Sequence, residues 1–342
     1  MATWFDESRL DDEAAWQRHD ATLRLLAESG ARVRREVVEA TEAISDGVTR
    51  AAGQQRPRAV VAAGPDSRLL RAVLEPWCPV PFVAWPAPSL PGWAGGLDLV
   101  VVLAHDGGAG SASAVAEAVR RGCQVVVACP PGSMVAEHAA GRWSTILPSS
   151  TRDQLATAVV MLEYLEQVQL GPRTDSEGVA TALDEVATAC SPHRDLAGNP
   201  AKELAISMAD SVPMVWGGSV LAARAARRIA ESLRRTSGRS ALAGDAEHLL
   251  PVLEAARQHD VFDDPFAGDA RDLGPMLLVL DDGNEEALVR EERGRLRAAA
   301  GSRGVRVETL TTEAPTEIAR YASLLLQGRY AAEYLGLGLT EE

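Results

Sequence analysis

Basic residues are under-represented in this chain of 342 residues. Lys and Arg together number 34 against 48 Asp and Glu, which gives a formal net charge of −14. Proteins that bind nucleic acid neutralise its phosphates with clustered Lys and Arg, so this balance argues against nucleic acid as a partner. One local cluster of arginines falls on a predicted helix, where we expect solvated side chains. Its members are Arg224, Arg227, Arg228, Arg234, Arg235 and Arg239.

Cysteine and long apolar runs are scarce as well. None of the four cysteines forms a C-x-x-C pair, so neither a zinc site nor a disulfide framework is expected. No apolar run approaches the length of a membrane span, and the acidic start of the chain lacks the apolar region of a signal peptide. We therefore expect a cytoplasmic protein without a metal site or membrane contacts.

Aromatic residues make up only 4% of the chain, so Ala, Val and Leu must fill its core. Ala-rich helix patterns beside Val-rich strand patterns are typical of the α/β class, and the length allows two domains with complete cores. Cys123 and Cys129 flank an apolar strand and are expected to be small core residues.

The segment 97–131 carries the strongest pattern. An apolar run at 99–103 ends in a glycine-rich turn, and apolar residues then recur at helical spacing over 112–119. A second apolar run follows at 125–127. Such strand–loop–helix–strand units build buried parallel sheets, and ligands bind at the carboxyl ends of their strands.

Two α/β units of this kind are predicted, as two copies of one architecture. In the first unit, strands are expected at 58–63, 80–84, 97–103, 124–129 and 143–147, with helices at 66–75 and 151–169. A connecting helix is expected at 177–190. In the second unit, strands are expected at 212–216, 276–280 and 305–309, with helices at 219–235 and 316–335.

The expected fold is therefore two doubly wound parallel-sheet subdomains, each in three αβα layers, with N-terminal and C-terminal helices packed on them. The predicted ranges are an N-terminal helical segment at 1–53, a first subdomain at 54–170, a connector at 171–198 and a second subdomain with the closing helix at 199–342.

The order of these elements resembles the SIS (sugar isomerase) fold used twice, and more narrowly the bifunctional phosphoglucose/phosphomannose isomerases of bacteria and archaea. The resemblance covers nearly the whole chain. It is carried by the strand, loop and helix at 99–122, the tetrapeptide Asn199-Pro-Ala-Lys202, the run VPMVWG at 212–217 and the helix GRYAAEYL at 328–335. It implies a sugar-phosphate ligand, no cofactor and a homodimer.

The resemblance also implies a phosphate site at two loops. In relatives one of them reads S-Y-S-G-N-T, and the aligned residues here are AHDGGA at 104–109. An aspartate repels a dianion at short range, so the phosphate chemistry of this loop is altered. The other loop, GPDS at 64–67, has also gained an acid and has lost a backbone donor to proline. The candidate substrate-binding residues are Gly64, Ser67, Asp106, Gly107, Gly108, Ser111 and Arg152.

Several of these residues also have a purely structural interpretation. Gly107 and Gly108 suit a tight strand-to-helix turn that needs positive φ. Asp106 would either coordinate a cation or sugar hydroxyls, or serve as the N-cap of the following helix. Ser111 opens that helix, and capping alone would explain it.

The family's catalytic base is a glutamate near the end of the second unit's first helix. That position falls at about Arg234 here, which is not a base. Glu231 lies one turn earlier on the same face, and His248 stands near the place of the family's ring-opening histidine. These two residues are the candidate catalytic pair. The structural alternative for Glu231 is an ion pair with neighbouring arginines.

Three functions are compatible with these patterns. The first is an aldose–ketose isomerase for glucose 6-phosphate or mannose 6-phosphate, in which a histidine opens the ring and a carboxylate moves the proton between C1 and C2. The altered loops favour the second, a sugar-phosphate-binding relative without catalysis that has a regulatory, structural or partner-binding role. The third is a dinucleotide-binding oxidoreductase, although the glycines at 107–110 lack the spacing of its fingerprint.

Overall fold

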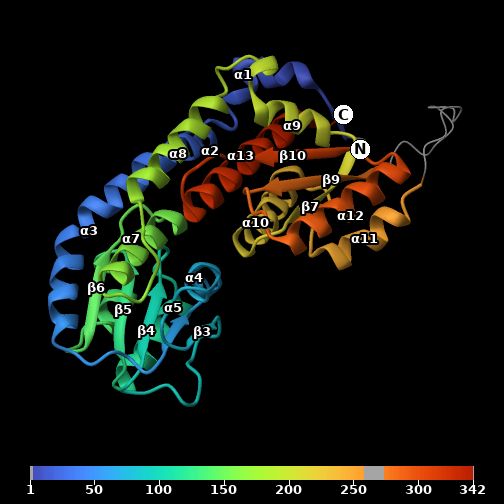
Figure 1. The fold of residues 1–342 in the computed structure, drawn as a ribbon. Helices are drawn as coiled ribbons and strands as arrows, with labels where there is room; N and C mark the ends of the chain where they lie inside the picture. Colours follow the sequence, from blue (N-terminus) through green and yellow to red (C-terminus); the bar gives the residue numbers. More distant parts are fainter. Residues whose placement is uncertain (1–2, 258–272, 342) are drawn as a thin grey trace, which may run out of the picture. The chain divides into compact units, whose positions relative to one another are not determined.

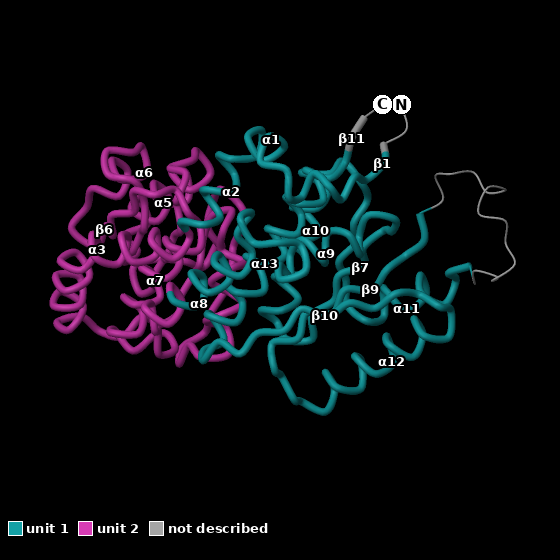
Figure 2. The backbone as a smooth tube through the Cα atoms, turned by 90° about the horizontal axis from the view of Figure 1, so that it is seen from above, with its two compact units in different colours: residues 1–28, 181–342 teal, residues 29–180 magenta. Residues whose placement is uncertain are grey.

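The computed structural model describes residues 3–257 and 273–341. These residues form two compact units, residues 1–28 with 181–342 (unit 1) and residues 29–180 (unit 2), which are drawn in different colours in Figure 2. The predicted N-terminal segment is divided between them at residue 28. Among the described residues, no helix combines the length and the apolar character that a membrane crossing requires.

Unit 2 contains a five-stranded parallel sheet in the order β3-β2-β4-β5-β6. Its strands are β2 (Val60–Ala63), β3 (Phe82–Trp85), β4 (Leu99–Leu103), β5 (Gln124–Cys129) and β6 (Ser144–Pro148). Its helices are α3 (Ser29–Ala52), α4 (Ser67–Leu74), α5 (Ala109–Arg120), α6 (Met134–His138) and α7 (Gln154–Gln167). Figure 1 shows α3 beside β6 at one edge of this sheet and β3 at the other edge. Helices α5 and α6 pack on one face of the sheet. Helix α8 (Ser176–Ala189) begins in unit 2 and ends in unit 1.

The central strands of unit 2 are buried on both faces, which explains why they are continuous apolar runs. All residues of β2 and β4 are buried. One core cluster joins alternate strand residues, such as Val100 and Val102, to Ala112 and Val115 of α5. The predicted core positions Cys123 and Cys129 are confirmed, since both belong to this cluster and are at most 1% exposed.

Unit 1 contains a four-stranded parallel sheet in the order β10-β9-β7-β8 and a short antiparallel pair, β1-β11. Its strands are β1 (Thr3–Phe5), β7 (Ser211–Gly217), β8 (Leu242–Ala243), β9 (Gly274–Asp281), β10 (Val307–Thr311) and β11 (Leu339–Glu341). Its α-helices are α1 (Glu13–Trp16), α2 (Asp20–Ala27), α9 (Pro200–Met208), α10 (Val220–Ser237), α11 (Ala246–Glu254), α12 (Ala287–Arg303) and α13 (Glu317–Gly338). Two 3₁₀ turns, η1 (Glu7–Asp11) and η2 (Leu196–Gly198), complete the unit.

The two sheets share one strand order. Counted along the chain within each unit, the strands lie in the order 2-1-3-4-5 in unit 2 and 2-1-3-4 in unit 1. The predicted fold of two doubly wound parallel sheets, with helices on both faces and terminal helices packed on them, is thus confirmed. In such sheets the first and third strands are neighbours at the topological switch point, where ligands of this fold class bind.

The single lysine of the chain, Lys202, connects α9 to η1 within unit 1. Asn199 caps α9 by accepting hydrogen bonds from the amides of Ala201 and Lys202. The Lys202 side chain is fully buried, and its Nζ lies 2.7 Å from Asp11 Oδ1. It also donates to the carbonyls of Pro192 and Arg194. A buried cation is tolerated here because every donor direction meets an oxygen.

Candidate functional site

The switch point of unit 2 brings together two loops that lie about 40 residues apart in sequence. The loop 64–67 follows β2 and the loop 104–108 follows β4, and these strands are paired in parallel. Gly64 and Gly107 adopt φ values of +86° and +66°, so both turns require glycine. Helix α5 starts directly after the second loop, and its first amide groups lie at this edge of the sheet.

A carboxylate–histidine pair bridges the two loops. His105 Nδ1 lies 2.9 Å from Asp66 Oδ2, and the other carboxylate oxygen of Asp66 accepts a hydrogen bond from the Gln154 amide. The contact with Asp66 raises the pKa of His105 more than burial lowers it, and the charges of Asp106 and Asp153 act in the same direction. Protonated His105 is therefore favoured, and it offsets part of the negative charge that the aspartates add to the site.

Asp106 is not the N-cap of α5. Gly108 occupies that position, and Asp106 Oδ1 accepts a hydrogen bond of 2.9 Å from the Gly108 amide. Its carboxylate thus closes an Asx turn before the helix. The N-cap interpretation is wrong, because the N-cap of α5 stands two residues after Asp106. Gly108 itself has φ −67°, so only Gly107 of the pair needs the left-handed region.

Arg152 is held in a strained backbone conformation at the same edge of the sheet. Its φ is +56°, which is uncommon for a residue other than glycine. The loop around it is fixed from α3: buried Glu36 accepts hydrogen bonds from the amides of Ser150 and Thr151. On the other side, Asp153 caps α7 and pairs with Arg32 at 2.8 Å. Strained residues of this kind cluster at binding sites, where the surrounding structure holds them in place.

Two buried hydroxyl groups at this edge have no hydrogen-bond partner among the described residues. They are Ser67 Oγ, on a side chain only 1% exposed, and Thr151 Oγ1. Ser111, which was predicted together with Ser67, is 3% exposed and faces Gly64, where an added Cβ would stand 3.4 Å from the Ser111 Oγ. Buried polar atoms nearly always find a partner, so unpartnered hydroxyls at a switch point suggest contact with a ligand or with water.

The corresponding edge of unit 1 is filled by the protein's own groups. The Ser219 hydroxyl, which caps α10, also donates to the Asp282 carboxylate across the switch point. Asp281 pairs with Arg293 at 2.6 Å. A Cβ added to Gly217 would stand 2.3 Å from the backbone of Ala222, so the loop packs directly on the helix.

The candidate catalytic residues lie apart along unit 1. Glu231 is bound to Arg228 at 2.8 Å, as the structural alternative predicted, and its side chain is 41% exposed. It stands eleven residues beyond the first residue of α10, which corresponds to about 17 Å along the helix axis. His248 is exposed in the first turn of α11, at the carboxyl edge where α10 also begins. Arg234, at the position aligned with the family's base, donates to the Ala241 carbonyl.

The structure thus gathers the predicted substrate-binding residues of unit 2 at one edge, but it does not gather the two catalytic candidates. The Asp66–His105 contact went unpredicted, although both residues stand in loops that follow strands. Within the described residues, no group of three or more His, Cys, Asp or Glu side chains is arranged to hold a metal ion.

Three comparisons relate this geometry to known proteins. Residues 197–339 match the family model of the bacterial phospho-glucose isomerase C-terminal SIS domain. No curated protein sequence matches the chain.

Solved structures share the fold at low sequence identity. The tagatose-6-phosphate ketose/aldose isomerase of Escherichia coli is 12% identical, with a TM-score of 0.65 and coverage of 91% of this chain and 93% of that one. The C-terminal domain of glucosamine-fructose-6-phosphate aminotransferase from Francisella tularensis is 12% identical, with a TM-score of 0.58 and coverage of 89% and 95%. A glucose-6-phosphate isomerase like protein from Thermus thermophilus is 15% identical, with a TM-score of 0.51 and coverage of 96% and 92%. Residues 197–339 therefore match an SIS domain family, and the chain has the fold of these phosphosugar isomerase structures.

Proposed function

We propose that this chain binds a sugar phosphate at the switch point of unit 2 and does not interconvert aldoses and ketoses there. The observation that carries the proposal is the buried, unpartnered hydroxyl of Ser67. It begins α4, directly after β2, where the related fold would hold a ligand. Ser111, Gly64 and the first amides of α5 add donors beside it.

The charges of the site are compatible with an anionic ligand despite the aspartates. Asp66 is engaged by His105 and Gln154, and one oxygen of Asp106 is engaged by the Gly108 amide. The N-terminus of α5 contributes a partial positive charge, and Arg152 adds a full one in the loop that follows β6 at the same edge of the sheet. Carboxylate oxygens with remaining acceptor capacity suit sugar hydroxyls.

An aldose–ketose isomerase is the second candidate, and the match of residues 197–339 to an isomerase domain family supports it. In that function Glu231 would act as the base and His248 as the ring-opening group. A base and a ring-opening acid must reach one sugar at the same time. The ion pair of Glu231 with Arg228 and its place far along α10 favour binding without turnover.

Calorimetry and a coupled isomerase assay together test the proposal. We expect purified protein to bind glucose 6-phosphate or mannose 6-phosphate saturably, and Ser67→Ala to weaken binding about tenfold through one lost hydrogen bond. Ser45→Ala, an exposed substitution on α3, serves as the matched control and should leave binding unchanged. Turnover above that of a Glu231→Gln, His248→Ala double variant would establish the isomerase instead.

We further propose that the chain forms a homodimer, as its resemblance to phosphoglucose/phosphomannose isomerases implies. Sedimentation equilibrium would give twice the chain mass of 36.3 kDa if this is right, and the single chain mass if it is wrong.

A further inference from the structure

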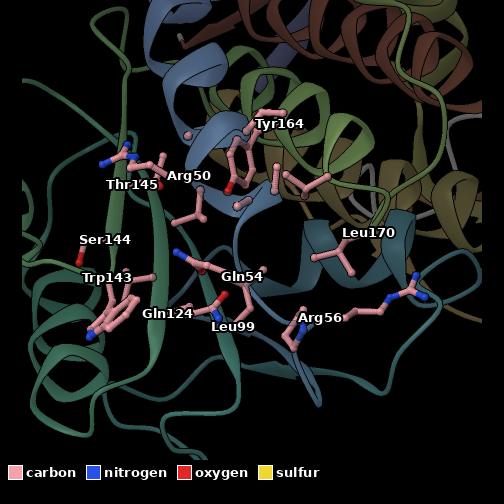
Figure 3. Close-up of a pocket in the computed structure, with 18 of the residues that line it drawn as sticks. Arg50, Gln54, Arg56, Leu99, Gln124, Trp143, Ser144, Thr145, Tyr164 and Leu170 are labelled. Atoms are coloured by element: carbon pink, nitrogen blue, oxygen red, sulfur yellow. The ribbon is translucent and has the colours of Figure 1, made fainter.

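A cavity of about 420 Å³ lies at the amino edge of the unit 2 sheet, opposite the switch-point loops (Figure 3). The first residues of three strands, Leu99, Gln124 and Ser144, contribute to its lining. The last turns of α3 and α7 and the segment 54–57 before β2 supply the rest. This volume lies within the range of small-molecule sites.

The cavity is basic in a strongly acidic protein. Arg50, Arg56 and Arg142 line it, and no Asp or Glu does. Arg50 donates to the Asp46 carbonyl and Arg56 to the Gln169 carbonyl. In the part of the chain that the structure describes, no carboxylate is ion-paired with any of these three guanidinium groups. Three arginines without counter-charges at one recess are suited to an anion.

Aromatic and aliphatic side chains line the cavity beside the three arginines. The Trp143 indole is 48% exposed, and the Arg142 guanidinium lies 4.8 Å from its ring centroid. The Tyr164 ring, Leu170 and Val125 complete the apolar lining. An exposed indole offers a flat face on which a planar ring can stack.

Neutral hydrogen-bonding groups also line the cavity. Thr145 and Tyr164 are buried and contribute hydroxyls, and Gln54 and Gln124 contribute amides. Burial raises the pKa of Tyr164, so its hydroxyl remains protonated at neutral pH. In Figure 3 the Tyr164 hydroxyl, Gln54 and Gln124 lie around one space.

The backbone at the mouth of this cavity is strained. Gln169 has φ +60° and forms the turn that ends α7, a position where glycine is usual. Its carbonyl accepts the hydrogen bond from Arg56. This hydrogen bond holds one of the three arginines at the rim.

We propose that this amino-edge cavity binds a small organic anion that carries a planar ring, either a nucleoside monophosphate or an aromatic carboxylate. The arginines at the rim would hold the anionic group, and Trp143 would hold the ring. The proposal does not rest on sugar-phosphate binding at the switch point, because the two sites lie at opposite ends of the strands.

Calorimetric titrations with five probes test it. Adenosine 5′-monophosphate and 4-hydroxybenzoate represent the two sources of this chemistry, and saturable binding of either supports the proposal and identifies the source. Adenosine, inorganic phosphate and glucose 6-phosphate lack either the charge or the planar ring, so each should bind to this cavity at least tenfold more weakly.

Variants locate the binding. Arg142→Gln and Arg50→Gln should each weaken binding of the preferred probe about tenfold, because each removes one charge-assisted contact. Arg235→Gln, an exposed arginine of α10, is the matched control and should have no effect. Absence of binding by both ring-bearing anions would overturn the proposal. So would equal binding of inorganic phosphate, or binding that survives both cavity variants.

Discussion

At the scale of single residues, the unusual feature of the switch point is a histidine held by an aspartate. Asp66 and His105 come from different loops and meet at 2.9 Å, with Gln154 on the remaining carboxylate oxygen. This contact raises the pKa of His105 above its ordinary value, so the site contains a group whose protonation depends on Asp66.

The Asp66→Asn substitution should lower the pKa of His105, because its largest raising cause is removed. Nuclear magnetic resonance titration of the imidazole would measure this, with Asp46→Asn on α3 as the control. The folded-state pKa lies above the ordinary value of 6.5. The pair therefore stabilises the fold below about pH 6.5, and this stabilisation is lost as the pH rises through the raised pKa. An unchanged His105 pKa in the variant would refute the assignment.

Lys202 is the residue on which we expect unit 1 to depend most. The Lys202→Met substitution keeps the buried length of the side chain but removes its contacts with Asp11, Pro192 and Arg194. We expect the free energy of unfolding to fall by about 2–4 kcal/mol. Chemical denaturation measures this, and Arg235→Met on the surface should change it by less than about 0.5 kcal/mol. Equal stability of the two variants would contradict the role given to Lys202.

At the scale of elements, the helices α10 and α13 pack so closely that a side chain is excluded at one point. A Cβ on Gly328 of α13 would stand 2.3 Å from Ile229 Cδ1 of α10, and Ile229 is only 1% exposed. Gly294 in α12 offers a matched comparison, since it is also helical and a Cβ there meets nothing within 4 Å.

The two glycine-to-alanine substitutions should therefore act in opposite directions. Gly328→Ala should destabilise the protein by about 1–3 kcal/mol through overpacking. Gly294→Ala should stabilise it by about 0.5–1 kcal/mol, because alanine favours the helix. Thermal unfolding of both variants measures these changes in stability. A stabilising Gly328→Ala would show that α10 and α13 leave room for a side chain at this point.

The predicted strands are accurate where the sheet is buried on both faces. The prediction 124–129 coincides with β5, and the prediction 97–103 contains β4. Both were predictable because a continuous apolar run is typical of a parallel strand that is buried on both faces. Helices α11 and α12 went unpredicted. Helix α11 contains Pro251, a residue that argues against a helix interior. Helix α12 is charged and buries only Val289, Leu296 and Ala300, so it lacks a clear apolar stripe. The pair β1–β11 joins distant ends of the chain and has no local signal.

At the scale of the whole molecule, one architecture occurs twice but with different chemistry at its switch points. In unit 1, Ser219 and Asp282 satisfy each other and Gly217 packs on α10. In unit 2, buried hydroxyls lack partners among the described residues and a strained Arg152 stands nearby. The repeat of fold therefore does not imply a repeat of function.

The candidate site was predictable in place but not in detail. Gly64, Ser67 and Asp106 follow strands, and parallel strands bring their carboxyl ends to one edge, so their proximity follows from the strand pattern. Glu36 and Arg32 of α3 contact the loop around Arg152, although more than a hundred residues separate them from it in sequence. These contacts depend on how α3 packs. No spacing in the sequence encodes such a contact.

Hydrogen–deuterium exchange with saturating glucose 6-phosphate or mannose 6-phosphate tests sugar-phosphate binding by unit 2. We expect slower exchange of amides in the segments 64–67 and 104–111 of unit 2. Exchange at 217–219 and 281–284 of unit 1, and at 142–145 of the amino-edge cavity, should not change. Protection confined to unit 1, or no protection at either switch point, would contradict sugar-phosphate binding by unit 2.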